Sequence, residues 1–288
     1  MRVQSINKFL KSTIFAVFPL IGACSWAGQM VKDSAEGATS YYGTDHFTLV
    51  TTVPPNFGFT SKAQYSPRAG QSCHVYVSAL GGEVMRHQQK TDDIDAKTIE
   101  QTARFDIPLE YHIAGCVMDL TRVDTNIDGR YGPTSLDIGG DGGGISVREF
   151  VPLGVSKFAL TEDTKFRGLC TWMFQLSVAR IQKDGISKIL SCSAADGDWK
   201  VPADYFSRSK PGGAVQKSNL KGKTVKLELR ISDEEEPSMD NRWIKTPQGW
   251  KPCQGTEKSK RCQIPPTFKT FKTFKMKGRE CVVYPSCT

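Results

Sequence analysis

The chain has 288 residues, of which 39% are hydrophobic and 24% are charged, and its formal net charge is +8. This composition is typical of a globular protein and excludes the low hydrophobicity and large charge excess of disordered chains. The positive charge is too small to indicate nucleic acid binding by itself.

The first 23 residues have the pattern of an export signal. Arg2, Lys8 and Lys11 precede a short apolar run, residues 14–23, and no acidic residue interrupts them. The run is too short to span a bilayer as a helix. Residues 20–24 read Leu-Ile-Gly-Ala-Cys, which resembles the lipobox of bacterial lipoproteins. We therefore expect residues 1–23 to be a lipoprotein signal peptide.

The lipobox resemblance implies that Cys24 is lipidated and becomes the mature N-terminus. Acyl chains would then hold the protein on a membrane surface without a crossing segment. Ser25 stands where an aspartate would resemble an inner-membrane retention signal, so we expect the periplasmic face of the outer membrane. An ordinary secretory signal, cleaved near Ala23 or Ala27, is the alternative. Residues 24–44 are small and polar and are expected to form a tether.

Cysteine usage also indicates export. Of nine cysteines, Cys24 is assigned to the anchor, and the remaining even number is typical of a disulfide framework. We expect each cysteine to pair with the next along the chain: Cys73 with Cys116, Cys170 with Cys192, Cys253 with Cys262, and Cys281 with Cys287. A zinc site is the alternative, although no C-x-x-C pair occurs and no histidine lies at ligand spacing.

Apolar residues mostly alternate with polar ones, which predicts a mainly β protein. Strands are expected at 46–53, 72–79, 103–112, 117–123, 145–151 and 223–231. Two further apolar runs, 170–180 and 186–192, are joined by Asp-Gly and predict a hairpin, with Trp172, Phe174, Leu176 and Val178 on one face. Asp92 to Thr102 is the one stretch that could form a helical turn.

The pattern lapses at residues 155–165, where we place a domain boundary. We expect a β domain over residues 45–157 and a second over residues 158–288, whose last part is rich in cysteine. The predicted fold is therefore two antiparallel β-sandwich-like units with a disulfide-stapled C-terminal extension.

The segment from residue 124 to 144 is rich in glycine, with seven glycines within sixteen residues, and predicts a long irregular loop. Asp124, Asn126 and Asp128 match the first half of a calcium loop, but Ser135 stands where the bidentate glutamate would be. An Asx-rich turn without metal is the alternative. We expect no cofactor.

No catalytic set emerges from the sequence. It contains four histidines but no Gly-x-Ser-x-Gly motif, so we expect no enzyme and no small-molecule substrate. Residues 269–277 interleave lysines with Phe271 and Phe274, a pattern that can bind single-stranded nucleic acid or anionic lipid. A solvated strand is the preferred interpretation, and we expect no nucleic acid partner.

An acidic run ends at Pro237. Its members are Asp233, Glu234, Glu235 and Glu236. Like charges repel, so a solvated turn is one interpretation. The other is an electrostatic contact for a basic partner, flanked by Trp243 and Trp250 as aromatic anchors.

One set of segments extends over most of the mature chain. It consists of Tyr65-Ser-Pro-Arg-Ala-Gly-Gln-Ser-Cys, Asp128-Gly-Arg-Tyr-Gly-Pro, Pro211-Gly-Gly, Gly222-Lys-Thr-Val, Asp233-Glu-Glu-Glu-Pro, Trp243-Ile, Gly249-Trp-Lys-Pro-Cys, Phe274-Lys-Met and Arg279-Glu-Cys-Val-Val-Tyr-Pro-Ser-Cys. These segments resemble immunity lipoproteins encoded beside type VI secretion phospholipase effectors.

The resemblance implies a periplasmic inhibitor that has no catalytic residues and whose partner is a protein toxin, a phospholipase effector. A phosphodiester-cleaving site must be electropositive, so the acidic loop could occupy the place of the lipid phosphate. An envelope lipoprotein that docks on an outer-membrane or cell-wall partner is the alternative, and an enzyme with an unrecognised site is a third.

Overall fold

The computed structural model describes residues 37–151, 163–176, 186–238, 242–253, 261–262 and 273–288. Contacts divide the chain into residues 1–40 and residues 41–288, and the second unit contains all the strands. The signal peptide, Cys24 and most of the expected tether lie outside the described residues. Tyr41 and Tyr42 already form a strand, so the folded part begins before residue 45. None of the described helices has the length and hydropathy needed to span a membrane.

The first of two large sheets has seven strands. They are β1 (Tyr41–Tyr42), β3 (Phe57–Pro67), β6 (Gln88–Ile94), β8 (Glu110–Ile113), β9 (Cys116–Arg130), β10 (Ile138–Arg148) and β13 (Gly212–Gln216). The long strand β9 pairs antiparallel with β8, β3 and β10. At the edge, β13 pairs parallel with β10.

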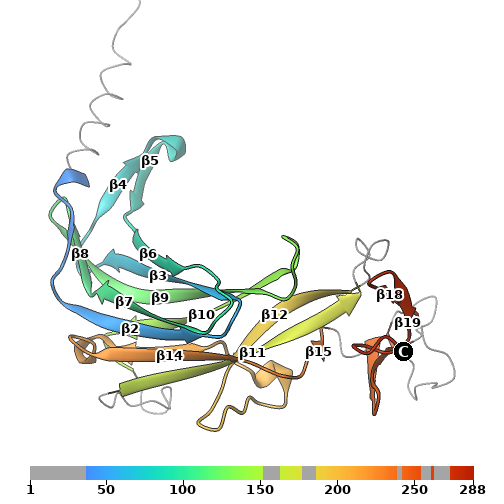
Figure 1. Cartoon of the computed structure of the whole chain (residues 1–288). Coiled ribbons are helices and arrows are strands. Elements are labelled where there is room, and N and C mark those ends of the chain that lie inside the picture. Colours follow the sequence, from blue (N-terminus) through green and yellow to red (C-terminus); the bar gives the residue numbers. More distant parts are fainter. Residues whose placement is uncertain (1–36, 152–162, 177–185, 239–241, 254–260, 263–272) are drawn as a thin grey trace, which may run out of the picture. The chain divides into compact units, whose positions relative to one another are not determined.

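The second sheet has six strands and lies below the first in Figure 1. They are β2 (His46–Val53), β7 (Gln101–Pro108), β11 (Asp163–Leu176), β12 (Ile186–Ala194), β14 (Thr224–Ile231) and β15 (Glu236–Pro237). The order is β12-β11-β14-β2-β7, and β15 pairs with the far end of β11. Strand β14 is parallel to both of its neighbours, β2 and β11.

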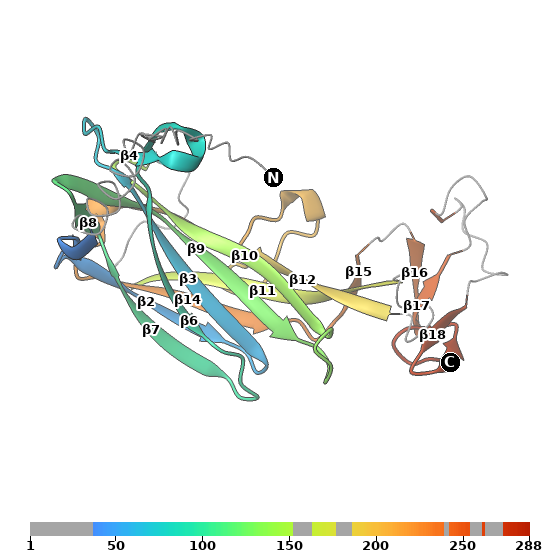
Figure 2. The same cartoon turned by 90° about the horizontal axis from the view of Figure 1, so that it is seen from above.

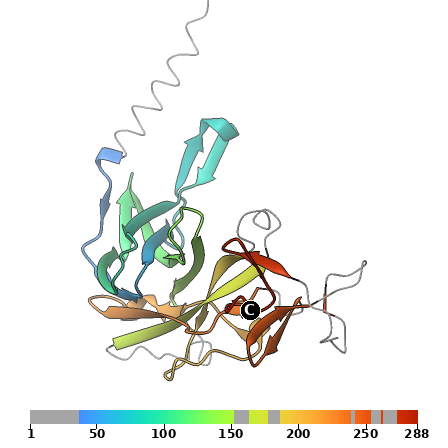
Figure 3. The same ribbon diagram turned by 45° about the vertical axis from the view of Figure 1, so that its right-hand side comes forward.

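Three short helical turns and three two-stranded sheets complete the part of the chain that the structure describes. The turns are η1 (Ser78–Leu80), η2 (Tyr205–Ser207) and η3 (Lys217–Asn219), and the paired strands are β4 (His74–Val77) with β5 (Gly82–Met85), β16 (Trp243–Thr246) with β17 (Gly249–Pro252), and β18 (Phe274–Met276) with β19 (Arg279–Cys281). The hairpin of β4 and β5 projects from the sheets (Figures 1 and 3).

The mainly β class is confirmed, with several sheets and disulfides near the C-terminus. The expected division at residues 157 and 158 does not separate two units, however. Strand β14 from the second half pairs with β2 from the first, and β13 pairs with β10. Both halves of the chain therefore contribute to both sheets, and residues 41–288 form one compact unit. The parallel pairs arise because strands far apart in the sequence meet in one sheet.

The core lies between the two sheets and is formed by the alternate strand residues that face inward. Val225, Leu227 and Leu229 of β14 are buried, as the alternation predicts. They pack with residues of the first sheet such as Phe59 and Ile127. Burying one such side chain contributes roughly 1.5–3 kcal/mol.

The glycine-rich segment forms strands, which corrects the prediction of a long loop. Strand β9 continues to Arg130, β10 begins at Ile138, and only residues 131–137 turn between them. A Cβ at Gly139 would lie 2.7 Å from the Trp172 ring of the other sheet. The glycines of β10 therefore permit a close approach of β10 to the second sheet, which a loop assignment overlooks.

The helical turn expected within residues 92–102 is absent from the structure. Residues 88–94 form β6 and residues 101–108 form β7. Alternate residues of β6 are half-buried against β3, so sheet pairing overrides the weak helical pattern. The hairpin prediction is confirmed, because β11 and β12 pair antiparallel. Its turn, residues 177–185, lies outside the described residues.

All four predicted disulfides are present: Cys73–Cys116, Cys170–Cys192, Cys253–Cys262 and Cys281–Cys287. Their sulfurs are therefore not available as zinc ligands. Cys170 and Cys192 face each other across β11 and β12, with a Cα–Cα distance of 3.9 Å. The last two disulfides staple the C-terminal extension, as expected.

The C-terminal extension packs on its own small core at the far end of β11 and β12 (Figures 1 and 2). Phe174 of β11 lies at the centre, with ring centroids 4.9 Å from Trp243 and 4.2 Å from Tyr284. Ile186 of β12, Phe274 and Cys281 complete the buried set. This aromatic cluster places the end of the chain beside β15 and the acidic run.

Candidate partner-binding cleft

The acidic run lies where the chain leaves β14 and returns to the second sheet. The Ser232 amide donates to the Cys170 carbonyl at 2.7 Å. Glu236 and Pro237 then pair with Met173 and Phe174 of β11. The run is therefore held against the end of β11 at both of its ends.

Glu235 and Glu236 contact different partners, as adjacent residues of an extended backbone face opposite sides. Glu235 forms an ion pair with Lys188 of β12 and accepts a hydrogen bond from the Tyr284 hydroxyl. Burial and the contact with Glu235 raise the pKa of Tyr284, so its hydroxyl is a neutral donor. Glu235 thus fastens the C-terminal cluster to the sheet.

The remaining members of the run have different surroundings. Glu236 pairs with Arg208 at 3.4 Å, and Glu234 pairs with Lys245 at 3.1 Å. Asp233 is exposed. Three of the four carboxylates therefore have a cation of their own chain beside them, which reduces the negative charge that the run presents to a partner.

The two tryptophans predicted as anchors also differ. Trp243 is only 5% exposed and belongs to the aromatic cluster around Phe174. It stabilises the extension and does not form part of the surface. Trp250 is partly buried, and Lys245 lies 5.7 Å from its ring centroid.

A cleft of about 710 Å³ opens beside these residues. Glu234, Glu236 and Trp250 line it, so the structure brings together three of the six predicted contact residues. Asp233, Glu235 and Trp243 are not among its lining residues. The other walls come from Met173 of β11, from the chain after β12 and from the C-terminal extension. The residues after β12 are Ala203, Tyr205, Phe206, Arg208, Pro237, Ser238, Arg242, Lys245 and Arg261.

The turn η2 supplies the most exposed aromatic side chain of the cleft. Phe206 is 94% exposed and Tyr205 is 54% exposed. Asp204 caps the turn, accepting from the Phe206 amide at 3.2 Å and from the Ser207 hydroxyl at 2.6 Å. These hydrogen bonds, with that from Ser207 first, lower the pKa of Asp204. An ionised Asp204 therefore holds the turn that presents Phe206.

Arg208 fixes this turn against β15. Its Nε donates to the Pro202 carbonyl at 2.9 Å, and its Nη1 contacts Glu236 at 3.4 Å. Its guanidinium also lies 5.7 Å from the Tyr205 ring centroid. Only 15% of the Arg208 side chain is exposed. The turn that carries Tyr205 and Phe206 is thus held in place in the free protein, which reduces the entropy cost of ordering its backbone on binding.

The calcium candidates lie in a strand. Asp124, Asn126 and Asp128 occupy alternate positions of β9 on the outer face of the first sheet. Asp124 pairs with Arg122 and accepts from Gln64. An extended strand cannot wrap its oxygens around one ion as a calcium loop does. No metal-binding group of three His, Cys, Asp or Glu side chains occurs among the described residues.

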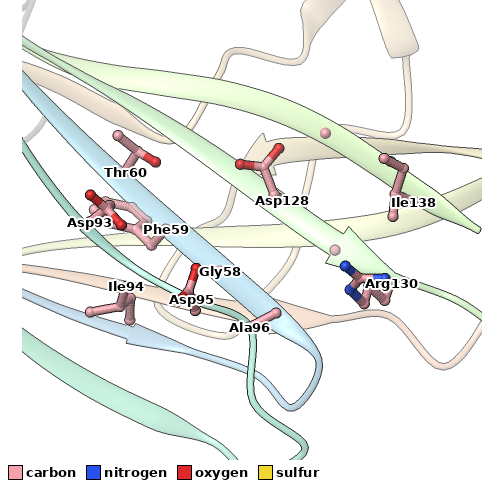
Figure 4. Close-up of a pocket in the computed structure, with 13 residues that line it drawn as sticks. Gly58, Phe59, Thr60, Asp93, Ile94, Asp95, Ala96, Asp128, Arg130 and Ile138 are labelled. Atoms are coloured by element: carbon pink, nitrogen blue, oxygen red, sulfur yellow. The ribbon is translucent and has the colours of Figure 1, made fainter. Parts of the chain in front are cut away.

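A second hollow, of about 440 Å³, lies on the outer face of the first sheet. Figure 4 shows Asp93 of β6 and Asp128 of β9 apart on separate strands, with Thr60 of β3 between them. Both carboxylates are exposed to solvent, and Arg130 lies on the same strand as Asp128. The groups do not converge on one point, so this hollow has no arrangement for catalysis.

Comparisons with protein-family models, with curated proteins and with solved structures found no match for this chain. Kinship with immunity lipoproteins therefore stays a prediction from the residues quoted above.

The sequence did not predict η2 or Arg208 as part of a site. One signal was present in the sequence. Two adjacent aromatic residues follow Asp204 and precede the polar residues 207–210, and aromatic side chains are enriched in protein interfaces.

Proposed function

We propose that this protein is a periplasmic lipoprotein that binds and inhibits a phospholipase effector of a type VI secretion system. The observation that carries the proposal is the cleft beside η2, with Phe206 exposed at its mouth. Tyr, Trp, Phe and Arg are the residues that concentrate in protein interfaces, and this cleft contains all four.

The disulfides support the compartment. Four cross-links in one chain are typical of proteins that fold in an oxidising environment such as the bacterial periplasm. Attachment through Cys24 would keep the protein where a delivered toxin reaches its lipid substrate. Inhibition by occlusion then requires only a tight contact near the toxin's active site.

The test uses the lipase or phospholipase effector encoded beside this gene. We expect an equimolar amount of the protein to suppress hydrolysis of phospholipid vesicles by that effector. Phe206→Ala should weaken binding by about 2 kcal/mol or more, because an exposed aromatic anchor loses most of its contact area. Calorimetric titration of the two purified proteins measures this change.

Phe150→Ala is the matched control, since Phe150 is 71% exposed but is not among the residues that line the cleft. It should bind as tightly as the unmodified protein. The proposal fails if no such gene lies beside this one, or if hydrolysis continues undiminished with excess protein present.

A further inference from the structure

The charge of the cleft differs from what the acidic run suggests. Among the described residues, its lining contains two carboxylates, Glu234 and Glu236, and four basic side chains, Arg208, Arg242, Lys245 and Arg261. Each carboxylate is paired with one of those bases, Glu236 with Arg208 and Glu234 with Lys245. Arg242 adds a positive charge that no described carboxylate neutralises, so the described lining carries a positive excess.

A basic partner would meet repulsion in this cleft, because the local carboxylates are already neutralised. A partner group with negative charge would be attracted. Apolar walls strengthen that attraction, since they reduce the screening by water. The charge of the lining thus opposes the idea that the acidic run enters an electropositive active site.

The apolar side chains of the cleft set a second requirement for its occupant. Met173 and Pro237 are buried at the base of the cleft, and Trp250, Tyr205 and Phe206 stand around it. An occupant that fills the space must bring apolar surface as well as charge. Pockets of roughly 300–1,000 Å³ enclose ligands of drug size, so this cleft admits a few side chains rather than a folded surface.

We infer that the cleft holds an extended acidic segment of a partner protein, in which carboxylates flank an aromatic or large aliphatic side chain. The carboxylates face the arginines and Lys245, and the apolar side chain lies against Phe206 and Trp250. The inference rests on the proposed function, because it states which part of the toxin is held. A bilayer fits less well, because the headgroups of a flat membrane surface would reach the rim of the cleft but not Met173 at its base.

The test uses two fluorescein-labelled heptapeptides, each with a central phenylalanine, flanked in one by glutamates and in the other by lysines. We expect the acidic peptide to bind in low salt, with saturable fluorescence anisotropy, and the basic peptide not to bind. Arg242→Glu and Phe206→Ala should each weaken binding at least about tenfold, which corresponds to ~1.4 kcal/mol. Added salt should weaken it further.

Arg148→Glu and Phe150→Ala are matched controls, because both residues are exposed and neither is among those lining the cleft. They should change the affinity by less than about twofold, a limit set by the small effect of a remote surface charge. Circular dichroism and thermal melting of all four variants establish that each is folded. Equal loss in the controls would contradict a site in the cleft.

The inference is overturned if the basic peptide binds as tightly as the acidic one, or if neither binds. It is also overturned if phosphatidylglycerol vesicles bind through Arg242 and the acidic peptide does not, since the cleft would then recognise lipid. Toxin inhibition is measured separately. Inhibition that depends on Phe206 without peptide binding would reject the acidic segment alone, whereas peptide binding without inhibition would reject the proposed function alone.

Discussion

Asp119 is a carboxylate with only 9% of its surface exposed. Arg68 lies 2.9 Å and Lys217 lies 2.7 Å from its Oδ1. Burial raises the pKa of Asp119, but the hydrogen bonds and charges of Arg68 and Lys217 outweigh that effect, so the pKa lies below its usual value. The carboxylate joins β9 to residues that follow β3 and β13.

Replacing this carboxylate should destabilise the fold. In Asp119→Asn the two cations lose their shared partner, and we expect a loss of about 1–3 kcal/mol, reduced by the partial exposure of Arg68. Urea unfolding at pH 7 measures the change. Asp95→Asn, at an exposed position, should leave stability almost unchanged. Equal losses would contradict the assignment.

The same group predicts a dependence of stability on pH. The pKa of Asp119 is lower in the folded state than its unfolded value of about 3.9. Asp119 therefore makes its full contribution to the free energy of unfolding above the unfolded pKa. This contribution is lost as the pH falls through the folded pKa. The free energy of unfolding should therefore decrease less on acidification in Asp119→Asn than in the unmodified protein. Urea titrations from pH 7 into the acid range test this, and parallel curves would contradict it.

At the scale of single elements, two glycines of β10 have different surroundings. A Cβ at Gly143 would overlap the carbonyl oxygen of Pro211, which is backbone, whereas a Cβ at Gly140 would meet Asp128 Oδ1 at 2.9 Å. That carboxylate can rotate away. Gly143→Ala should therefore cost about 1–3 kcal/mol and expose the amides of β13 to hydrogen exchange. Gly140→Ala is the control, and equal effects would contradict this account.

The C-terminal extension depends on one side chain of β11. Phe174→Ala removes the centre of the aromatic cluster, and deletions of this kind cost about 3–5 kcal/mol. We expect β16 to β19 to become sensitive to limited proteolysis while the two large sheets stay resistant. Phe166→Ala, in the main core, should instead lower the stability of the whole unit. An intact extension in Phe174→Ala would contradict this organisation.

At the scale of the whole molecule, the four disulfides make stability depend on the compartment. Removing Cys170–Cys192 by alanine substitution should cost about 2–4 kcal/mol, because the unfolded chain gains freedom. In protein isolated from its native envelope, mass spectrometry should find four cross-links and a lipid-modified Cys24 at the N-terminus. An intact Met1 with reduced thiols would contradict export.

The candidate site was only partly predictable. The sequence predicted Glu234 and Glu236 as contact residues because of the negative charge of their run, and Trp250 because it is a large aromatic residue. The ion pairs of Glu234 with Lys245 and of Glu236 with Arg208 could not be predicted, because Lys245 and Arg208 belong to other segments of the chain. Phe206 became a candidate only when the structure showed it exposed beside them.

The sequence by itself determined what depends on neighbouring residues. It predicted the alternating burial of β14 and the pairing of adjacent cysteines. The tertiary structure alone decided which strands share a sheet, that the glycines of β10 form a strand, and that the cleft is basic. Alternation and spacing act locally along the chain, whereas strand partners, close backbone approaches and the charges around a cleft come from residues that only folding brings together.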